Sequence, residues 1–411
     1  MTYTSAMERM RITRLGHKGD GIGAGGVLVP RGLPGEEVEG EVDAGRMDAP
    51  RIVTPCADRV RSPCSHFKTC GGCALQHASD PFLGAWKQDV VAAALAARGI
   101  GAEFRPIAVS PARSRRRAAL AGRRMKKGAL VGFHARRSDT VVAVTDCHLL
   151  TPALNAVMPV LSDITMAGGS RKGEITFTVT DTLGGVDVVC QGGKPMDPAL
   201  NAALVTLAHR GNLARLVWNA EQVVQLQTPA IRFDGIAVSV PPGAFLQATA
   251  AGEAALRDAV RRAVGDPRRI ADLFAGCGTF ALPLARGAEV LAVEGEAALL
   301  AALETAWRRA AGLHAIRTQT RDLFRRPLQP DELRGLDAVV IDPPRAGAAA
   351  QMAELAASAV PVIAAVSCNP VTFARDAETL LTGGYRLDWV QVVDQFRWSP
   401  HVELAARFVR D

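Results

Sequence analysis

The sequence has few aromatic residues and no long apolar run. Aromatic residues make up 5% of the 411 residues, and only two residues are Tyr. A surface on which several nucleic-acid bases stack in succession is therefore not expected. The longest apolar stretches fall short of the ~18 residues that indicate a membrane-spanning helix, and the N-terminal segment lacks the apolar core of a signal peptide. These absences predict a soluble, cytoplasmic protein with no membrane partner.

Acidic residues are missing from one segment of the chain. Residues 113–137 contain ten Lys or Arg residues and no Asp or Glu, whereas the formal net charge of the whole chain is +7. The positive charge therefore belongs to this segment. A basic stretch can be an ordinary solvated surface, but such density without compensating acids favours a surface that binds a polyanion. We predict a nucleic acid as the partner, with Arg115, Arg116 and Arg117 in the binding surface.

The chain is too long for a single hydrophobic core, and its pattern changes twice. Residues 1–58 combine Gly-rich turns with short apolar segments, which predicts a small β-barrel. Residues 59–240 mix a helix with pairs of alternating strands. Residues 241–411 alternate apolar runs with helical segments, as in a parallel sheet covered on both faces. The expected fold class is α/β for the C-terminal domain, preceded by an N-terminal barrel and a mixed α+β central domain.

Several acidic residues stand where the expected parallel strands end, which is where such sheets bind ligands. Asp272 opens a Gly-rich turn that lacks the third glycine of a dinucleotide fingerprint. Glu294 closes the second strand, where a carboxylate can bind a ribose diol. Asp322 follows the third strand, and Asp342 ends the fourth, before two rigid prolines. Each acid alone could be a turn or cap residue. Together they predict an S-adenosylmethionine site, because acids suit a cationic sulfonium ligand without phosphate.

A cysteine, Cys368, ends the fifth expected strand within the sequence S-C-N-P. A thiolate is the side-chain nucleophile most accessible near neutral pH, once a positive environment lowers its pKa. Methyl transfer needs such a nucleophile when the acceptor is C5 of a pyrimidine, because addition of the thiolate to C6 makes C5 nucleophilic. The adduct must then lose its C5 proton to a base, so we expect a carboxylate nearby. Spacing alone does not single out which acid it is.

Four of the eight cysteines fall within eighteen residues. Three of them, Cys64, Cys70 and Cys73, form C-x5-C-x2-C, and Cys147 follows later. Four thiolates can bind zinc or an iron–sulfur cluster. A zinc ribbon usually has two C-x2-C pairs, and the C-x3-C-x2-C of radical methyl-donor enzymes is absent. Two glycines between the last two cysteines suit a loop around a bulky cluster. Packing without a metal is the alternative.

Four segments together resemble the RNA uracil-5-methyltransferase family: DLFAGCGTFALPLA, DPPRAG, SCNPVTFARD and the terminal HVE. The resemblance implies a Rossmann-like class I methyltransferase domain in which Cys368 is the nucleophile and Glu403 is the base. The segment PPGAFLQATAAGE is similar to a donor-binding segment of the family. The implied S-adenosylmethionine-binding residues are Gln247, Phe274, Thr279, Glu294, Asp322 and Asp342. At the position of Thr279, bacterial members often have Asn.

The N-terminal half resembles the ribosomal-RNA branch of the same family. Residues 1–58 are similar to its TRAM domain, an OB-like barrel that binds RNA. The cysteine segment is similar to the branch's [4Fe-4S] segment, which implies Cys64, Cys70, Cys73 and Cys147 as ligands. The implied function is methylation of C5 of a uridine in 23S rRNA, with the target base flipped out of its stack. Methylation of uridine 54 of tRNA is the alternative, although that branch usually lacks the barrel and the cluster.

Three other functions stay open on the sequence. A cytosine-5 methyltransferase needs a similar thiol, but S-C-N-P and the terminal H-x-E are not typical of it. A non-catalytic RNA-binding assembly factor predicts a missing nucleophile or base, and both are present. An iron–sulfur electron carrier is the third alternative, for which the basic segment is an unusual companion. DNA is not an expected partner.

Overall fold

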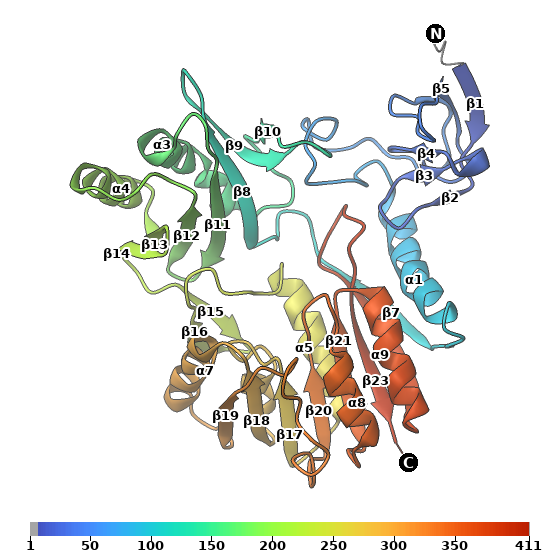
Figure 1. Ribbon diagram of the computed structural model, residues 1–411, viewed down its shortest axis with the longest axis vertical. Helices are drawn as coiled ribbons and strands as arrows, with labels where there is room; N and C mark the ends of the chain where they lie inside the picture. Colours follow the sequence, from blue (N-terminus) through green and yellow to red (C-terminus); the bar gives the residue numbers. More distant parts are fainter. Residues whose placement is uncertain (1–6, 411) are drawn as a thin grey trace. The chain divides into compact units, whose positions relative to one another are not determined.

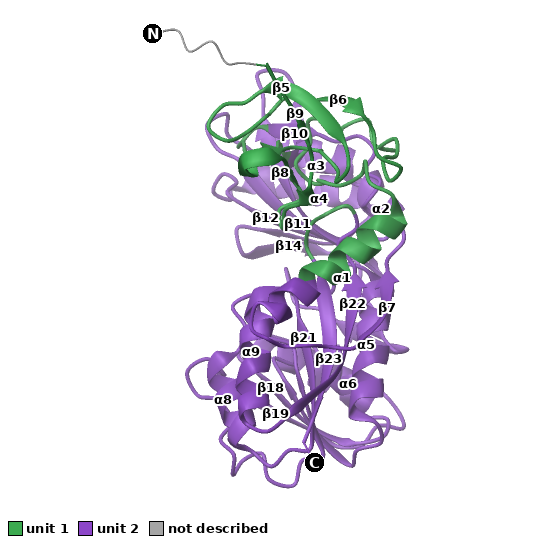
Figure 2. Cartoon of the chain, turned by 90° about the vertical axis from the view of Figure 1, so that its right-hand side faces the viewer, with its two compact units in different colours: residues 1–90, 134–140, 398–401 green, residues 91–133, 141–397, 402–411 purple. Residues whose placement is uncertain are grey.

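The computed structural model describes residues 7–410, which form two compact units (Figure 2). Unit 1 contains three stretches of chain: residues up to 90, 134–140 and 398–401. Unit 2 contains the others: residues 91–133, 141–397 and those from 402 onward. The domain boundaries that we expect after residues 58 and 240 divide the chain differently and stay predictions.

Unit 1 contains two small antiparallel sheets, with strand orders β1-β5-β6 and β2-β3-β4 (Figure 1). Their bounds are β1 (Met7–Arg11), β2 (Arg14–Leu15), β3 (Gly21–Ile22), β4 (Leu28–Val29), β5 (Glu37–Glu41) and β6 (Arg51–Thr54). Met10, Ile12, Val29, Val38 and Met47 form the small core. Because these strands form two sheets rather than one closed sheet, the expected barrel is not confirmed.

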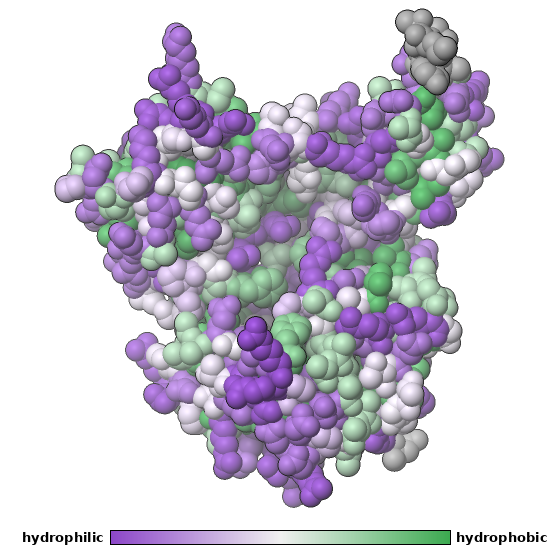
Figure 3. Space-filling view, in the orientation of Figure 1, coloured by the Kyte–Doolittle hydropathy of each residue, from purple (hydrophilic) through white to green (hydrophobic). Residues whose placement is uncertain are grey.

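Unit 2 begins in the second half of α1 (Asp80–Ala96) and contains a seven-stranded sheet of order β10-β9-β8-β11-β12-β13-β14. The pairs β8–β9, β8–β11, β11–β12 and β13–β14 are antiparallel, and β12 pairs with β13 in parallel. The strands are β8 (Arg117–Arg124), β9 (Ala129–His134), β10 (Val141–Ala143), β11 (Ile175–Thr182), β12 (Gly185–Gln191), β13 (Leu213–Trp218) and β14 (Glu221–Gln225). The helices are α2 (Pro152–Ala156), α3 (Met158–Gly168) and α4 (Pro198–Arg210). The turn between β8 and β9 projects as a hydrophilic tip (Figures 1 and 3).

The second sheet of unit 2 has eight strands in the order β19-β18-β17-β20-β21-β23-β22-β7. The first five strands are parallel, and β23 runs antiparallel to both β21 and β22. The strands are β7 (Phe104–Val109), β17 (Arg269–Leu273), β18 (Glu289–Glu294), β19 (Ile316–Thr320), β20 (Ala338–Ile341), β21 (Val362–Ser367), β22 (Arg386–Asp394) and β23 (Glu403–Val409). The other elements are the hairpin β15 (Ala230–Phe233) and β16 (Ile236–Ser239) and the helices α5 (Ala250–Val264), α6 (Ala281–Leu284), α7 (Ala297–Arg309), α8 (Ala349–Ala357) and α9 (Pro370–Thr382).

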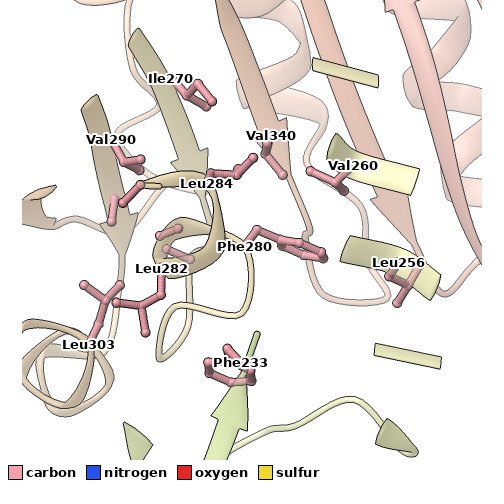
Figure 4. Close-up of a cluster of buried hydrophobic side chains, with 14 of the residues drawn as sticks. Phe233, Leu256, Val260, Ile270, Phe280, Leu282, Leu284, Val290, Leu303 and Val340 are labelled. Atoms are coloured by element: carbon pink, nitrogen blue, oxygen red, sulfur yellow. The ribbon is translucent and has the colours of Figure 1, made fainter. Parts of the chain in front are cut away.

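Both faces of the parallel strands are buried, as their continuous apolar runs predict. Alternate residues of β17 belong to different apolar clusters, Ile270 to one and Ala271 to the other. The first cluster joins the sheet to α5, α6, α7 and the β15–β16 hairpin (Figure 4). The second joins it to α8, α9 and the end of α1. Burial on both faces leaves only the strand ends for a site. Within residues 7–410, no helix is long and apolar enough to cross a membrane.

Candidate active site

Cys368 directly follows β21, on a turn that its two neighbours stabilise. Ser367 Oγ accepts a hydrogen bond from Asn369 N at 3.2 Å. The Asn369 side chain caps helix α9 by accepting from Val371 N at 3.1 Å, and its Nδ2 donates to Arg345 O at 2.9 Å. Pro370 at the first helical position has no N–H to leave unpaired. The S-C-N-P sequence thus builds a rigid strand-to-helix turn, with Cys368 at its centre.

Two carboxyl groups act on the Cys368 thiol. Burial, followed by the negative charges of Glu403 and Asp342, raises the pKa of Cys368 to about 11, against a smaller opposing effect of Arg345. Burial raises the pKa of Asp342 to about 7. Burial and the charge of Asp342 hold the pKa of Glu403 well above its usual range. The three groups therefore lie close enough to interact, in a place where negative charge lacks sufficient compensation. A cation that enters this site lowers all three pKa values.

A hydrogen-bonded chain of side chains joins Asp342 to Glu403. Gln247 Nε2 donates to Asp342 Oδ2 at 3.3 Å. Gln395 Nε2 donates to Gln247 Oε1 at 2.5 Å and to Glu403 Oε2 at 3.0 Å. Gln247, Gln395 and Glu403 are each buried. The structure thus brings together four of the residues expected from the sequence, Cys368, Glu403, Gln247 and Asp342. Gln395 joins them without having been expected.

Glu294 organises the Gly-rich turn after β17. Its carboxylate accepts hydrogen bonds from three backbone N–H groups, those of Gly276 at 3.0 Å, Gly295 at 2.7 Å and Glu296 at 3.0 Å. Gly276 has φ of +54°, a conformation that glycine adopts without strain. Asp272, at the start of the turn, is completely buried, and burial followed by the charge of Asp342 raises its pKa well above the usual range. The Gly-rich turn therefore lies close enough to Asp342 for the charge of Asp342 to act on Asp272.

Phe274 and Phe324 form an aromatic pair beside this turn. Their ring centroids are 5.4 Å apart, and the rings are inclined at 56°. Phe274 has φ of 62°, in the left-handed region where non-glycine residues are strained by about 1–3 kcal/mol. Phe324 is 49% exposed, and the side chain of Asp322 accepts from its backbone N at 3.0 Å. Phe324 was missed from the sequence. Its signal was an aromatic residue two positions after the expected acid, Asp322, in a loop.

The remaining expected donor-binding residue, Thr279, is half-buried after the Gly-rich turn. Its expected role stays a prediction.

The prediction that Arg115, Arg116 and Arg117 belong to a nucleic-acid-binding surface is wrong for Arg116. Its side chain is buried and forms an ion pair with the buried Glu253, and its Nε donates to Gln247 O at 3.2 Å. Arg117 Nη2 donates to Gly243 O at 3.1 Å, and burial followed by the charge of Arg115 lowers its pKa. These arginines support the backbone around Gln247, because guanidinium groups also satisfy buried carbonyl oxygens.

The expected iron–sulfur ligands do not form a metal site in the structure. Across residues 7–410, no group of three or more His, Cys, Asp or Glu side chains is arranged to hold a metal ion. Cys64, Cys70 and Cys73 belong to unit 1, whereas Cys147 belongs to unit 2. The glycine after Cys70 is explained by close backbone packing rather than by a need for space around a cluster. A Cβ atom on Gly71 would lie 2.7 Å from His134 O, so close backbone contact requires glycine there. The cluster prediction is therefore not supported.

Comparison with known proteins gives the relationship of the whole chain. The family described as tRNA (uracil-5-)-methyltransferase matches residues 205–410. The chain belongs to this family. It is an RNA uracil-5-methyltransferase, and the expected enzyme class is confirmed.

Relatives match this uracil-5-methyltransferase over nearly its full length. An RNA methyltransferase of Rhizobium meliloti (strain 1021) is 43% identical over 404 residues, which are 96% of this chain and 97% of that protein. A 23S rRNA (uracil(1939)-C(5))-methyltransferase of Cronobacter sakazakii is 33% identical over 92% of this chain and 90% of its own length. The crystal structure of a Pyrococcus abyssi tRNA (uracil-54, C5)-methyltransferase has a TM-score of 0.76 and 23% identity, and the match covers 98% of this chain and 99% of that one. The last match confirms the expected class I methyltransferase fold.

Proposed function

We propose that this uracil-5-methyltransferase transfers a methyl group from S-adenosylmethionine to C5 of a uridine in RNA, with Cys368 as the nucleophile and Glu403 as the base. One observation carries the proposal. A thiol and a buried carboxyl group interact electrostatically at the ends of β21 and β23, and a hydrogen-bonded chain continues from Glu403 to Gln247 and Asp342.

The donor site is acidic, and S-adenosylmethionine supplies an electrophilic methyl group on a positively charged sulfur. Burial raises the pKa of Asp342, and burial followed by the charge of Asp342 raises the pKa of Glu403, against smaller opposing effects of Gln395 and Arg345. A positively charged ligand is therefore favoured there. Glu294 holds the Gly-rich turn with both carboxylate oxygens, and Oε2, which accepts only one of the three backbone hydrogen bonds, has a further lone pair for a ribose hydroxyl. Phe274 and Phe324 offer an aromatic surface for an adenine ring.

The Cys368 side chain becomes a nucleophile only when ligands occupy the site. With a pKa of about 11, the Cys368 side chain is protonated at neutral pH in the protein without ligands. When positive charge enters beside Asp342 and Glu403, the two carboxylates repel a thiolate less, and the pKa of Cys368 falls. Addition of the Sγ thiolate to C6 of the uracil then forms the S–C6 bond and shifts the electrons of the C5–C6 double bond toward C5. C5 attacks the methyl group, and the bond between the methyl carbon and the donor sulfur breaks to release S-adenosylhomocysteine.

Glu403 completes the reaction. After methylation, C5 carries both its proton and the new methyl group. Glu403 takes that proton, the electron pair reforms the C5–C6 double bond, and the S–C6 bond breaks to release Cys368. A carboxylate with a raised pKa is a stronger base than an exposed one, because its basicity lies nearer the working pH. Burial of Glu403 thus supports its role as the base.

We propose 23S rRNA as the substrate. The likeness to the Cronobacter sakazakii enzyme supports it, because 33% identity extends over 92% of this chain. The fold likeness to the Pyrococcus abyssi tRNA enzyme makes tRNA the second candidate. Phe245 is 69% exposed and Val371 is 68% exposed, and they lie two and three residues from Gln247 and Cys368. Such apolar side chains suit the unstacked bases of single-stranded RNA. No step of the proposal uses a metal cluster.

The test uses methyl-labelled S-adenosylmethionine and unmodified ribosomal and transfer RNA, offered separately. After digestion to nucleosides, we expect labelled 5-methyluridine from ribosomal RNA. Cys368→Ser should abolish the product but retain donor binding, and Glu403→Gln should accumulate a covalent protein–RNA adduct. Cys56→Ser is the matched control and should keep full activity. Product from tRNA alone would move the substrate to the second candidate. Full activity of Cys368→Ser would refute the mechanism.

A further inference from the structure

Gln395 lies at the centre of the hydrogen-bonded chain, on the residue that follows β22. It is 2% exposed. Its Nε2 atom donates to both Glu403 Oε2 at 3.0 Å and Gln247 Oε1 at 2.5 Å. Its Oε1 atom accepts from Ala248 N at 2.7 Å. Both N–H groups and one carbonyl lone pair of the amide are therefore used, and one side chain contacts the proposed base and the proposed donor-binding segment.

The direction of the Gln395 amide is fixed by the backbone. Ala248 N–H can only donate, so the carbonyl oxygen of Gln395 must face it. The NH2 group then has to face Glu403 and Gln247. Gln247 consequently presents its oxygen to Gln395 and its own NH2 group to Asp342. A single backbone N–H thus sets the polarity of every hydrogen bond along the chain.

The segment that carries this N–H is itself held in place. Arg116 N donates to Ala248 O at 2.9 Å, and Arg116 Nε donates to Gln247 O at 3.2 Å. The guanidinium is buried and paired with Glu253. Residues 247 and 248 are therefore fixed on one side by Arg116 and on the other by Gln395.

We propose that Gln395 is a positioning residue that orients the carboxylate of Glu403 for removal of the C5 proton and ties its orientation to the donor-binding segment at Gln247. This inference rests on the proposed function and deepens it. A buried glutamine can also be a satisfied polar group that only contributes to folding. The difference is that a positioning residue changes the step that Glu403 performs, whereas a structural residue does not.

The expected effect follows from the loss of one hydrogen bond to a carboxylate. Such a bond contributes an amount equivalent to about a 10- to 100-fold effect. The groups that face Glu403 are Asp342, Cys368, Arg345 and Gln395, and the last two favour its charged form. Without the N–H of Gln395, the carboxylate is less stabilised and its pKa rises. The base form is then populated only at higher pH.

The experiment uses Gln395→Met, which keeps the length of the side chain and removes both donors. Single-turnover reactions with methyl-labelled S-adenosylmethionine and unmodified RNA would follow adduct formation and product release separately, over a range of pH. We expect the adduct to accumulate, release to slow ~10- to 100-fold, and the acidic limb of the release profile to move to higher pH. Gln395→Glu should move the limb in the same direction, because it places a second carboxyl group beside Glu403.

Gln351→Met is the matched control. Gln351 is also fully buried, and its amide is hydrogen-bonded to the backbone N and O of Leu328 at 2.8 and 3.1 Å rather than to a residue of the chain described above. It should lower the melting temperature without accumulating adduct. If Gln395→Met and Gln395→Glu fold, release product at the rate of the wild type and keep its pH profile, the inference is refuted while the proposed function stands. If the wild type itself makes no 5-methyluridine, both are refuted.

Discussion

Substitution of Arg116 by Met should destabilise the protein without weakening its electrostatic attraction for RNA. The guanidinium is paired with Glu253, whose side chain is 2% exposed. Removal of one partner of a buried ion pair costs about 3–5 kcal/mol, because the other charge is left without compensation. Glu253 keeps a second partner in Arg257 at 2.6 Å. We therefore expect the lower end, about 3 kcal/mol, in the free energy of unfolding.

The pH dependence of this loss has a definite sign. Burial raises the pKa of Glu253 above its usual value in spite of Arg116 and Arg257. Loss of Arg116 raises it further. A carboxyl group whose pKa is higher in the folded than in the unfolded state destabilises the fold progressively as pH rises. The stability difference between the variant and the wild type should thus be small in acid, where Glu253 is protonated in both, and grow toward neutral pH.

Urea unfolding and the salt dependence of RNA binding measure the two effects separately. Lys126→Met, in the exposed turn between β8 and β9, is the matched control. It should leave stability unchanged and reduce the slope of log affinity against log salt by about one. Arg116→Met should lower stability and leave the salt slope unchanged. The double variant Arg116→Met, Glu253→Met should recover much of the lost stability. Unchanged stability of Arg116→Met together with a reduced salt slope would refute the reasoning.

Three further predictions concern the site. Alkylation of Cys368 by iodoacetamide in the protein without ligands should be slow at neutral pH and accelerate about tenfold per pH unit toward pH 11, since only the thiolate reacts; a plateau below pH 8, read by mass spectrometry, would contradict the raised pKa. Phe324→Ala should weaken S-adenosylmethionine binding about tenfold in calorimetry and leave RNA affinity unchanged, because an exposed ring loses its stacking role; equal donor affinity would exclude Phe324 from the site. Phe245→Ala should lower RNA affinity by about 1–3 kcal/mol and Val371→Ser by less, because only Phe245 offers a ring for a base to stack on; neither should change the melting temperature, and unchanged affinity of both would place neither at the RNA.

The parallel part of the sheet and its strand-end residues were predictable because their signals are local. Apolar runs of strand length ended at Glu294, Asp342 and Cys368, and those residues follow or close β18, β20 and β21 in the structure. The S-C-N-P sequence also encoded its own turn and helix cap. In each case the pattern that gave the signal, an apolar run with its terminal residue or a turn with its helix cap, lies within a few residues along the chain.

The other parts of the fold and of the site depend on contacts between residues that are distant in the sequence, and a sequence pattern does not show such contacts. Strand β7 pairs with β22 at the edge of the eight-stranded sheet, although the expected boundary after residue 240 separates them. Gln395 is informative only because β22 brings it beside Gln247 and Glu403. The burial of Arg116 was missed because a count of charges treats every arginine as solvated. The cysteine spacing likewise gave no information on how its loop folds.

Strand β23 lies between β21 and β22 in the sheet although it follows both of them in the sequence. During translation, β21 and β22 are both synthesised before residue 403. The sheet therefore lacks the strand between them until β23 leaves the ribosome. Nascent chains that lack β23 have no Glu403, the proposed base, beside Cys368 and present two unpaired strand edges. Premature termination in this region should thus yield inactive, aggregation-prone products, and methyl transfer should begin only when synthesis has passed residue 409.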